Sequence, residues 1–322
     1  MAQSEELDII NKAVYELVSQ VPSGKITTYG LIARALGDNS TVVARAVGRI
    51  LASNPKPIQI PCHRVIHADG SLGGYRLGTS KKAELLLKEG INIEGGKAKA
   101  LNKILFKKFR SFYPLKKLRE AQIKLSKNVV LQDVFDEIKY IGGLDVTYFD
   151  NIGIGVAVVF DYSAKTLVEH KIVKSEVVFP YISTYLSFRE FPIIKEVVEL
   201  LSHKPQILML DGNGVLHPFC IGVASHAGIK LNIATIGVAK SLLCGKVQCI
   251  PTEKGKSSEI IYKSKLAGYC LKSAKNANPI YVSPGHKISF DTALEIVKKF
   301  CCFRIPEPIR VADKIGRMMR DI

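Results

Sequence analysis

The sequence of 322 residues contains no tryptophan, no apolar run long enough to cross a bilayer and no cysteine pair spaced as C-x-x-C. Apolar runs such as Ile152–Phe160 are far shorter than the roughly 20 residues that a membrane-spanning helix needs. The first ten residues, MAQSEELDII, carry acids where a secretory signal needs basic side chains. We therefore expect a cytoplasmic protein with no membrane partner.

The seven cysteines are scattered along the chain, and their number is odd. In a reducing compartment this pattern favours free thiols over a disulfide framework, and it lacks the spacing of a zinc site. One of these thiols must therefore be considered as a nucleophile.

Acidic residues are scarce in one segment of the chain. Between residues 96 and 128 a single acid stands against eleven Lys and Arg, so this segment carries +10 of the total net charge of +17. Phe106, Phe109, Phe112 and Tyr113 interleave with the basic side chains, which would let the segment follow a polyanion and still pack an apolar face. Nucleic acid is the simplest partner for this charge. An anionic membrane surface or a solvated linker and helix are the other interpretations.

Apolar spacing predicts helices in the first part of the chain, over 8–21, 29–37 and 41–53. Thr27 or Thr28 can cap the second helix and Ser40 the third. Two short helices joined by a tight turn are a weak helix-turn-helix signal, and a simple core hairpin fits the pattern equally.

Strand patterns dominate after the basic segment. NVVLQ, YIGGLDVTYF, IGIGVAVVFDY and TLVEHKIVKSEV predict an antiparallel meander. Helices over 192–203 and 217–231 then alternate with the strands QILMLDG and IATIGVAK, before a hairpin over 262–272 and a last helix over 291–300. This alternation predicts a mixed α/β sheet. We predict a first domain at 1–95, a basic linker at 96–108 and a second domain at 109–322.

Cys62 lies between Pro61 and His63 in the segment IQIPCHRVIHADGSLGGYRLG. A neighbouring histidine can take the proton of a cysteine, directly or through a water, and the thiolate is the reactive form. Cysteine is also among the residue types most often buried, so an inert core thiol is the alternative.

The motif IPCHRV, preceded by NP and followed by GGYR and LLLKEG, resembles the DNA-binding domain of the O6-alkylguanine-DNA alkyltransferases over roughly residues 7–95. The resemblance implies a small, mostly α-helical, winged-helix-like domain with a helix-turn-helix and no cofactor. It implies that Cys62 attacks the alkyl carbon on a flipped guanine and keeps the alkyl group. A related class that only binds the lesion has tryptophan in place of this cysteine, which this chain cannot supply.

The same resemblance assigns further residues of the alkyltransferase site. His63 and Glu89 would complete a proton relay, and Asn54 would be the hinge after the recognition helix. Arg45 would enter the base stack in place of the extruded base, and Tyr29 would rotate the nucleotide out.

Charged residues interrupt or end three predicted strands in the second part. Asp145 lies inside YIGGLDVTYF, Asp211 ends QILMLDG and Lys240 ends IATIGVAK. A carboxylate inside a sheet is costly unless it is paired or bound to a metal, and α/β sheets collect ligands at the carboxyl ends of strands. With Gly212 and Gly214 permitting close backbone approach, the pattern indicates a phosphate or metal site. Capping and ion pairing are the alternatives.

Seven motifs in order, GLDVTY, FPYISTYLSFRE, LDGNG, HPFCIGVASHAG, GVAKS, SPGH and RIPEPIRVAD, resemble endonuclease V over roughly residues 109–322. The resemblance implies an RNase H-like α/β domain that uses Mg²⁺, with Mn²⁺ as a substitute. Asp145 and Asp211 would be the metal ligands, with Glu190 and His286 completing the site directly or through water. Lys240 would stabilise charge on the phosphate. The implied product is a nick one nucleotide 3′ of hypoxanthine.

The resemblance also implies how the nuclease meets the damaged base. Pro180, Tyr181 and Ile182 match a wedge that separates the strands, and the Gly212 backbone lies where the family has its base pocket. The family usually follows the wedge with Pro-Gly, whereas this chain has Ser-Thr. If the missing glycine normally lets the backbone approach the base, Thr184 should reshape the pocket and alter base preference.

Three further side chains are assigned by the same motifs. His217 is implied as an outer-shell residue, and His226 is expected to be a core histidine. Asn213 stands in DGNG where histidine or glutamine is usual.

These observations predict a bifunctional repair enzyme that acts on double-stranded DNA with alkylated or deaminated bases and needs no obligate protein partner. Two alternatives stay open. The nuclease half could act on inosine in RNA, or the chain could be a non-enzymatic lesion-binding protein with vestigial sites.

Overall fold

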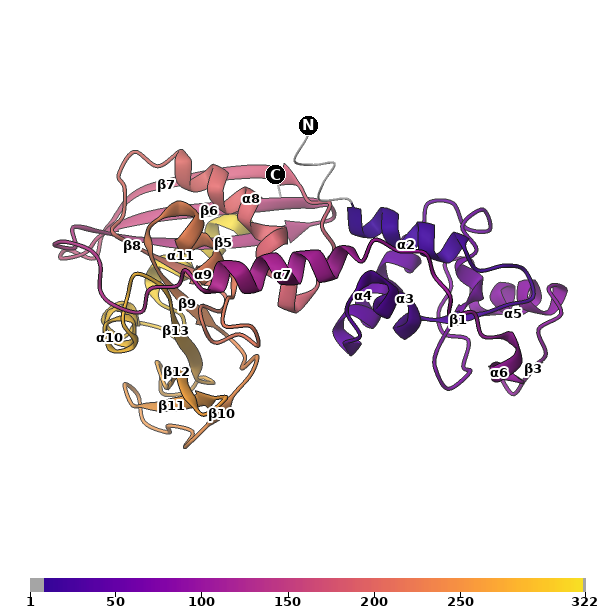
Figure 1. Cartoon of the computed structure of the whole chain (residues 1–322). Coiled ribbons are helices and arrows are strands. Elements are labelled where there is room, and N and C mark those ends of the chain that lie inside the picture. Colours follow the sequence, from indigo (N-terminus) through magenta and orange to yellow (C-terminus); the bar gives the residue numbers. More distant parts are fainter. Residues whose placement is uncertain (1–8, 321–322) are drawn as a thin grey trace. The chain divides into compact units, whose positions relative to one another are not determined.

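The computed structural model describes residues 9–320, so Asp8 and the acidic N-terminal residues considered above lie outside the described range. The chain divides into two compact units. Unit 1 comprises the residues up to Glu120 together with Val178–Ser183, and unit 2 comprises Ala121–Val177 and the chain from Thr184 onward (Figure 1). No helix within the described range is both long and apolar enough to span a membrane.

Unit 1 is built on three helices, two of which begin at capping side chains. Thr28 Oγ1 accepts a hydrogen bond from the amide of Leu31 (3.2 Å), and Ser40 Oγ accepts one from the amide of Val43 (3.4 Å). Gly37 ends the second helix with φ at 98°, a conformation that glycine adopts readily. These contacts confirm the predicted caps. The helices are α2 (Ile9–Ser19), α3 (Tyr29–Leu36) and α4 (Thr41–Ala52).

The rest of unit 1 packs around a second apolar cluster that includes Ile26, Ile66 and Leu86. β1 pairs with β2 in parallel, and β3 pairs with β4 in antiparallel orientation. The elements are β1 (Thr27–Thr28), the 3-10 turn η1 (Cys62–Arg64), β2 (Val65–Ile66), α5 (Thr79–Lys88), β3 (Ile93–Glu94), β4 (Lys97–Ala98), α6 (Leu101–Ile104) and α7 (Pro114–Ser126), which begins in unit 1.

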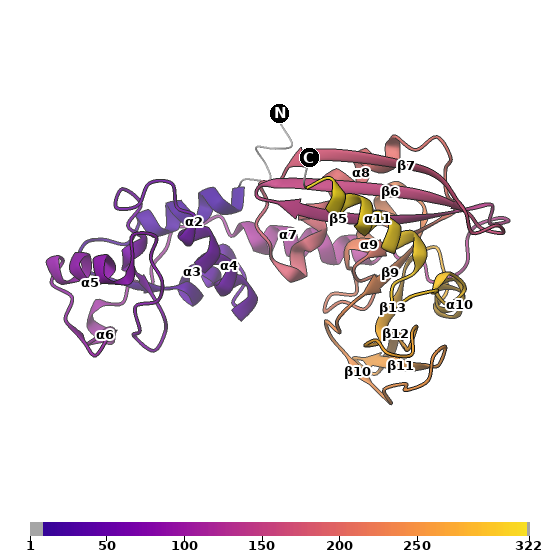
Figure 2. The same ribbon diagram turned by 180° about the vertical axis from the view of Figure 1, so that it is seen from behind.

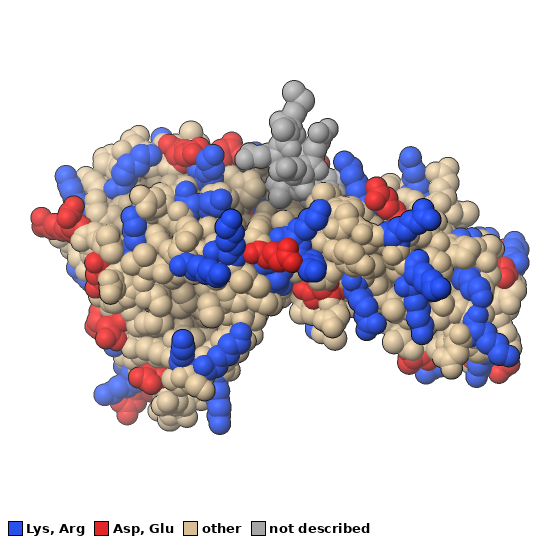
Figure 3. Space-filling model, in the orientation of Figure 1, with Lys and Arg blue, Asp and Glu red and all other residues tan. Residues whose placement is uncertain are grey.

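Residues 96–108, predicted to be a linker, are folded as part of unit 1. The amide of Ile26 donates to Ile104 O (3.0 Å), and the amide of Phe106 donates to Ile26 O (2.7 Å). Ala98 is buried, whereas the lysines of this segment are exposed. The high density of lysines suggested a linker. The apolar residues that alternate with these lysines are the ones that pack against the core of unit 1. Figure 3 shows Lys and Arg side chains spread over the face in view, with fewer acids between them.

Unit 2 is organised around one nine-stranded mixed sheet in the order β10-β11-β12-β13-β9-β8-β5-β6-β7. The pairs β5–β8 and β8–β9 are parallel and the other pairs antiparallel, so β5–β6–β7 forms the predicted meander. The strands are β5 (Tyr140–Phe149), β6 (Ile152–Asp161), β7 (Leu167–Glu176), β8 (Ile207–Asp211), β9 (Ala234–Ala239), β10 (Lys246–Val247), β11 (Ser257–Tyr262), β12 (Lys265–Leu271) and β13 (Ile280–His286).

Helices cover both faces of this sheet. α8 (Leu186–Glu199) and α9 (Val223–Leu231) lie on one face, while α10 (Phe290–Phe300) and α11 (Glu307–Met318) lie on the other (Figures 1 and 2). Side chains of the central strand β8 alternate between the two cores, with Leu208 packing among residues of α8 and α9, and Met209 among residues of α10 and α11. Gly143 permits the close approach of α11, because a Cβ there would lie 2.2 Å from the carbonyl carbon of Pro308.

Two features of unit 2 differ from the sequence prediction. NVVLQ is a loop, because Val130 uses its backbone to contact the last residue of β13 and the residue that follows it. Its amide donates to His286 Nδ1 (3.2 Å), and its carbonyl accepts from the amide of Lys287 (2.7 Å). α11 was not predicted, since its buried stripe consists of Pro308, Ile309, Ala312 and Gly316, which are mostly small.

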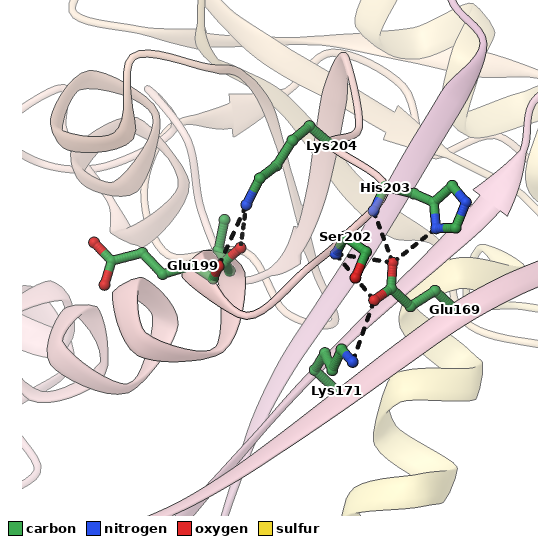
Figure 4. A network of polar contacts seen from close by, with 7 residues as sticks. Glu169, Lys171, Glu199, Ser202, His203 and Lys204 are labelled. Carbon is green, nitrogen blue, oxygen red and sulfur yellow. Dashed lines mark hydrogen bonds and ion pairs between the residues drawn. The ribbon is translucent and has the colours of Figure 1, made fainter.

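A polar network fastens the chain after α8 to the edge strand β7 (Figure 4). The Glu169 carboxylate accepts hydrogen bonds from the amides of Ser202 (3.0 Å) and His203 (2.8 Å), and it also contacts His203 Nδ1 (3.0 Å) and Lys171 Nζ (3.4 Å). Partial burial alone would raise the pKa of Glu169. The hydrogen bonds to its ionised form outweigh this and lower the pKa to about 2.

Candidate active sites

Cys62 starts the turn η1 of unit 1 and is held by the amide side chain of Asn54. Cys62 is 4% exposed, and Asn54 Nδ2 lies 3.1 Å from its Sγ. Asn54 is fully buried, and its orientation is fixed because Nδ2 also donates to Ile60 O (3.2 Å) and Oδ1 accepts from the amide of Lys56 (3.0 Å). Asn54 therefore ties the sulfur of Cys62 to the backbone of Lys56 and Ile60.

His63 and Glu89, the two residues predicted to form a relay, contact each other, and Arg64 fixes the carboxylate. His63 Nε2 lies 3.0 Å from Glu89 Oε1, while Arg64 donates from Nε and Nη2 to the same carboxylate and from Nη1 to Val21 O. Burial lowers the pKa of His63 although Glu89 acts in the opposite direction. Burial would raise the pKa of Glu89, but Arg64 and His63 outweigh it and lower the pKa.

These contacts define the tautomer of His63. Since an ionised Glu89 can only accept, the neutral ring carries its proton on Nε2. Nδ1 is then a lone-pair acceptor, and it is buried without a hydrogen-bond partner in the described part of the chain. The ring is arranged to take one proton at Nδ1.

A cavity of about 630 Å³ opens beside Cys62, and this volume is in the range of small-molecule sites. Tyr29 and Arg45, predicted to contact DNA, line it together with Cys62. His67 also lines the cavity, and its ring centroid lies 5.1 Å from that of Tyr29. Burial raises the pKa of the Tyr29 hydroxyl, and Cys62 adds to the rise.

Lys82 was missed by the sequence analysis. Its side chain is fully buried, and Nζ donates to Val65 O (2.6 Å) and Gly74 O (3.2 Å), which joins the strand after Cys62 to the cavity wall. Burial lowers the pKa of Lys82 to about 8. Helical spacing could have shown its inward position, because Lys82 precedes the buried Leu86 by four residues on α5.

The register of unit 2 brings Asp145, in the middle of β5, to the level of Asp211, at the carboxyl end of the neighbouring strand β8. Leu144 of β5 pairs with Leu210 of β8, so the two aspartates follow at the same level. Lys240 follows β9, the next strand, and its Nζ lies 2.5 Å from Asp211 Oδ2. Glu190 joins the site from α8.

Mutual repulsion marks these groups as one site. Burial raises the pKa of Asp145 to about 7, and the charges of Asp211 and Asp313 contribute. Burial also raises the pKa of Glu190 well above its usual range, with Asp145 and Asp211 adding to the rise. Burial would lower the pKa of Lys240, but the carboxylates outweigh it and raise the pKa.

The donor set suits a hard divalent cation, which prefers carboxylate oxygens and would relieve their repulsion. Within residues 9–320, no three His, Cys, Asp or Glu side chains already stand in an arrangement that could hold a metal ion. The Lys240 ammonium contacts Asp211 and is the positive charge that pairs with this carboxylate here. Asp145 and Asp211 fit the predicted role of metal ligands if a bound cation replaces the ammonium as the partner of Asp211.

Asp313 of α11 contributes a fourth carboxylate that the sequence analysis missed. It acts on the pKa of Asp145, and its own carboxylate pairs with Arg317 (2.8 Å). The signal was present, since Asp313 ends the motif RIPEPIRVAD, but no role was assigned to it. Tyr148 was also missed. Its hydroxyl donates to Glu190 Oε1 (3.3 Å), and the Arg189 guanidinium lies 4.3 Å from its ring centroid.

The structure does not bring His286 to the carboxylates. His286 pairs with Thr235 near the start of β9, whereas Asp211 pairs with Val238 near the end of that strand. Three residues of strand separate the two levels by about 10 Å. His286 Nδ1 instead accepts from the amide of Val130 (3.2 Å). We correct its predicted place in the metal site on this ground.

The remaining predicted residues take varied positions. Gly212 has φ at 152°, and a Cβ there would lie 2.4 Å from Val223 Cγ1. Asn213 Oδ1 is buried without a hydrogen-bond partner among the described residues. His217 is buried, and its Nδ1 accepts from the amide of Phe219 (3.2 Å). His226 is a core histidine between Phe188 and Phe191, and burial lowers its pKa to about 4.

The wedge residues belong to unit 1. Tyr181 is 51% exposed, and Pro180 is half-buried. Ile182 is 1% exposed, so its side chain does not form part of the surface. The wedge role stays a prediction.

Comparisons with known proteins match both parts of the chain. The endonuclease V family model matches residues 123–314, and that of the 6-O-methylguanine DNA methyltransferase DNA-binding domain matches residues 10–91. A bifunctional methyltransferase/endonuclease of Picrophilus torridus is 39% identical over 302 residues, covering 93% of each chain. Another, of Thermoplasma volcanium, is 35% identical and covers 98% of this chain and 91% of its own length.

A solved structure supports the fold of unit 2. The endonuclease V of Ciona intestinalis, in complex with a 24mer DNA containing an inosine followed by a ribo-adenosine, is 33% identical with a TM-score of 0.58. The match covers 64% of this chain and 98% of that one.

Proposed function

Since this chain belongs to the endonuclease V family and also carries the DNA-binding domain of the 6-O-methylguanine DNA methyltransferases, we propose that it is a DNA-repair enzyme with two activities. It transfers alkyl groups from O6-alkylguanine to Cys62, and it nicks DNA beside deaminated bases. The observation that carries the proposal is that each unit holds a complete set of groups for its own reaction. A thiol beside a hydrogen-bonded histidine–carboxylate pair lines a cavity in unit 1, and carboxylates from β5, β8 and α8 gather with a lysine in unit 2.

The alkyltransferase reaction begins at Cys62. His63 accepts the thiol proton at Nδ1, directly or through a water, and its Nε2 proton stays on the hydrogen bond to Glu89, which Arg64 holds in place. The thiolate attacks the alkyl carbon, the carbon–oxygen bond breaks, and its electron pair leaves with guanine. Guanine takes up one proton, which balances the proton that the thiol gave to His63. Arg45 and Tyr29, at the cavity, offset the few kcal/mol that flipping the base costs. The thioether is permanent, so Cys62 reacts once.

The nuclease reaction follows from the carboxylates of unit 2. Asp145 and Asp211 would hold Mg²⁺ or Mn²⁺, with Glu190 and Asp313 beside them. A bound divalent cation polarises the phosphodiester and lowers the pKa of the attacking water. Lys240 supplies a further positive charge that neutralises the phosphate as negative charge develops on it.

The family resemblance also supports proposals about the fold subtype, the position of the nick, the contacts with the damaged base and the substrate. The helical part of unit 1 would be winged-helix-like and unit 2 RNase H-like, and the nick would fall one nucleotide 3′ of hypoxanthine. Pro180 and Tyr181 would separate the strands, while the Gly212 backbone would contact the extruded base. The substrate would be double-stranded DNA.

A second candidate is a nuclease that acts on inosine in RNA. The observation that favours it is the Ciona relative, which was solved with DNA in which a ribo-adenosine follows the inosine. Fusion to a DNA alkyltransferase unit favours DNA. A lesion-binding protein without activity is disfavoured, because Cys62, Asp145, Glu190, Asp211 and Lys240 are all present.

One experiment tests both activities. The full chain is incubated with duplexes that carry a single O6-methylguanine or a single hypoxanthine, with and without Mg²⁺. Methyl transfer should be stoichiometric, independent of metal and lost in Cys62→Ala. Nicking should turn over, stop on chelation and be lost in Asp145→Asn.

Matched controls are available for both variants. Cys249→Ala removes an exposed thiol, and Asp150→Asn removes an exposed carboxylate from the turn after β5, so both should behave like the parent. Loss of both activities in either Cys62→Ala or Asp145→Asn would contradict two separate sites. Nicking of an inosine-containing RNA at a far higher rate than of the DNA would favour the second candidate.

A further inference from the structure

The segment Val178–Ser183 is matched by the endonuclease V family, yet it packs within unit 1. Two apolar side chains anchor it, since Phe179 is 2% exposed and Ile182 is 1% exposed. Between them Tyr181 is left 51% exposed. The segment is therefore a loop with two buried anchors that presents one aromatic ring at the surface.

Two side chains of unit 1 bind the backbone of this loop. Asn11 of α2 donates from Nδ2 to Val178 O (3.0 Å), and Arg49 of α4 donates from Nη2 to Tyr181 O (2.6 Å). The Arg49 guanidinium also lies 5.6 Å from the Tyr181 ring centroid. A guanidinium that binds both the carbonyl and the ring of one residue restricts its backbone and its side chain together.

The two helices that supply these contacts are fastened to each other. The Tyr15 hydroxyl of α2 donates to Ile50 O of α4 (3.1 Å), one residue after Arg49. Arg49 also follows Arg45 by four residues, which places both on one side of α4. The helix side that carries the predicted base-replacing arginine therefore also holds Tyr181.

We propose that Arg49 is a positioning residue for the nuclease, which holds Tyr181 in the orientation needed to separate the strands of a duplex. The inference rests on the proposed nuclease function and deepens it, because it makes nicking of duplex DNA depend on helices of unit 1. Asn11 supports the same loop at its other end. A loop that only joined β7 to η2 (Ser183–Tyr185) would not need side chains of two helices to bind its backbone in addition to its two buried apolar side chains.

The test compares full-length variants on hypoxanthine in a duplex and in a single strand, with Mg²⁺. Arg49→Met keeps the aliphatic stem and removes the guanidinium. It should lower kcat for duplex nicking by about tenfold to a hundredfold, as expected for a displaced group, while nicking of the single strand stays near the parental rate. Arg49→Lys, which keeps a charged donor, should restore most of the loss. Arg34→Met, at an exposed position of α3, is the matched control and should have no effect.

A double-mutant cycle shows whether the effect passes through Tyr181. If it does, Arg49→Met should add nothing to the defect of Tyr181→Ala. An equal loss of methyl transfer and duplex nicking in Arg49→Met would overturn the proposal, because Arg49 would then be a DNA contact of α4. An impaired Tyr181→Ala beside an unimpaired Arg49→Met would also overturn it while the proposed nuclease function stands. A parent that does not nick either substrate would refute that function and this inference with it.

Discussion

At the scale of single residues, the side chain of Cys62 is surrounded by groups that local sequence does not place near it. Asn54 lies eight residues earlier and Glu89 lies 27 residues later, yet one donates to the sulfur and the other fixes the tautomer of His63. The adjacency of Cys62 and His63 in sequence indicated a reactive pair. The structure shows that the acceptor nitrogen of His63 follows from Glu89 and Arg64, because an ionised carboxylate forces the proton onto Nε2.

Thr184 provides a test of base preference at this scale. It lies in η2, and its carbonyl accepts from Gln122 Nε2 (3.3 Å), so the backbone here is fastened to the buried start of unit 2. We expect Thr184→Gly to remove the side chain that limits approach to the base and to raise nicking of hypoxanthine relative to other deaminated bases by about tenfold. The measurement is a comparison of kcat/KM across duplexes that differ only in the lesion.

Thr252 provides the control for Thr184→Gly. Thr252→Gly makes the same change at an exposed position of a loop and should leave all lesions unchanged. Equal kcat/KM ratios for Thr184→Gly and the parent would show that this side chain does not shape the base pocket.

A site residue could be predicted from the sequence when its place on a strand determines its neighbours. Asp211 and Lys240 were predictable, because residues at the ends of neighbouring parallel strands meet at one sheet edge, and Asp145 was predictable because a carboxylate inside a strand needs a partner. Asp313 was not, since it reaches the site from a helix at the far end of the chain. His286 was misplaced because its motif gave no information on which end of β13 faces the carboxylates.

At the scale of elements, helix ends and the meander could be predicted, and α11 could not. Thr28 and Ser40 act locally, so their hydrogen bonds to amides three residues later follow from sequence alone. α11 buries a stripe of small residues against β5, at the position where Gly143 leaves room for Pro308. Its burial depends on a complementary surface in another element, which no local pattern reveals.

The Glu169 network predicts a pH-dependent contribution to stability. Its pKa of about 2 in the folded protein lies below the value of about 4.3 expected in the unfolded chain. The stabilisation is therefore complete above about pH 4.3 and is lost as the pH falls towards 2. We expect Glu169→Gln to lower the free energy of unfolding by about 1 kcal/mol at pH 7, since hydrogen bonds to an ionised acceptor are lost.

Urea denaturation at a series of pH values checks this expectation. The difference between Glu169→Gln and the parent should shrink below about pH 4 and vanish near pH 2. Glu176→Gln, at the exposed end of the same strand, is the matched control and should show no such trend. A constant difference across this pH range would exclude ionisation of Glu169 as its cause.

At the scale of the whole molecule, the positive charge concentrated in residues 96–128 is compatible with a folded segment. The lysines of residues 96–108 are exposed, while Ala98, Leu101, Ile104 and Leu105 between them belong to an apolar cluster of unit 1 or pack against it. Such a surface raises the local concentration of DNA for both activities at low salt. The two reactions then share a substrate polymer without sharing a reactive group.

The last prediction concerns the independence of the two activities. Methylation of Cys62 adds an uncharged methyl group within unit 1, so we expect the electrostatics of the carboxylates in unit 2 to be unchanged. The methyl group displaces the Asn54 donor from Sγ, but Asn54 keeps its contact with Ile60, and Arg49 lies more than one helical turn earlier. We therefore expect protein that is fully methylated by excess O6-methylguanine DNA to nick hypoxanthine duplexes within about twofold of the parental rate.

A mock-treated sample provides the control, and the number of methyl groups per protein is measured by intact mass. A large fall in nicking after methylation would mean that Cys62 acts on Tyr181 through α4, which would make the spent alkyl acceptor a switch for the nuclease.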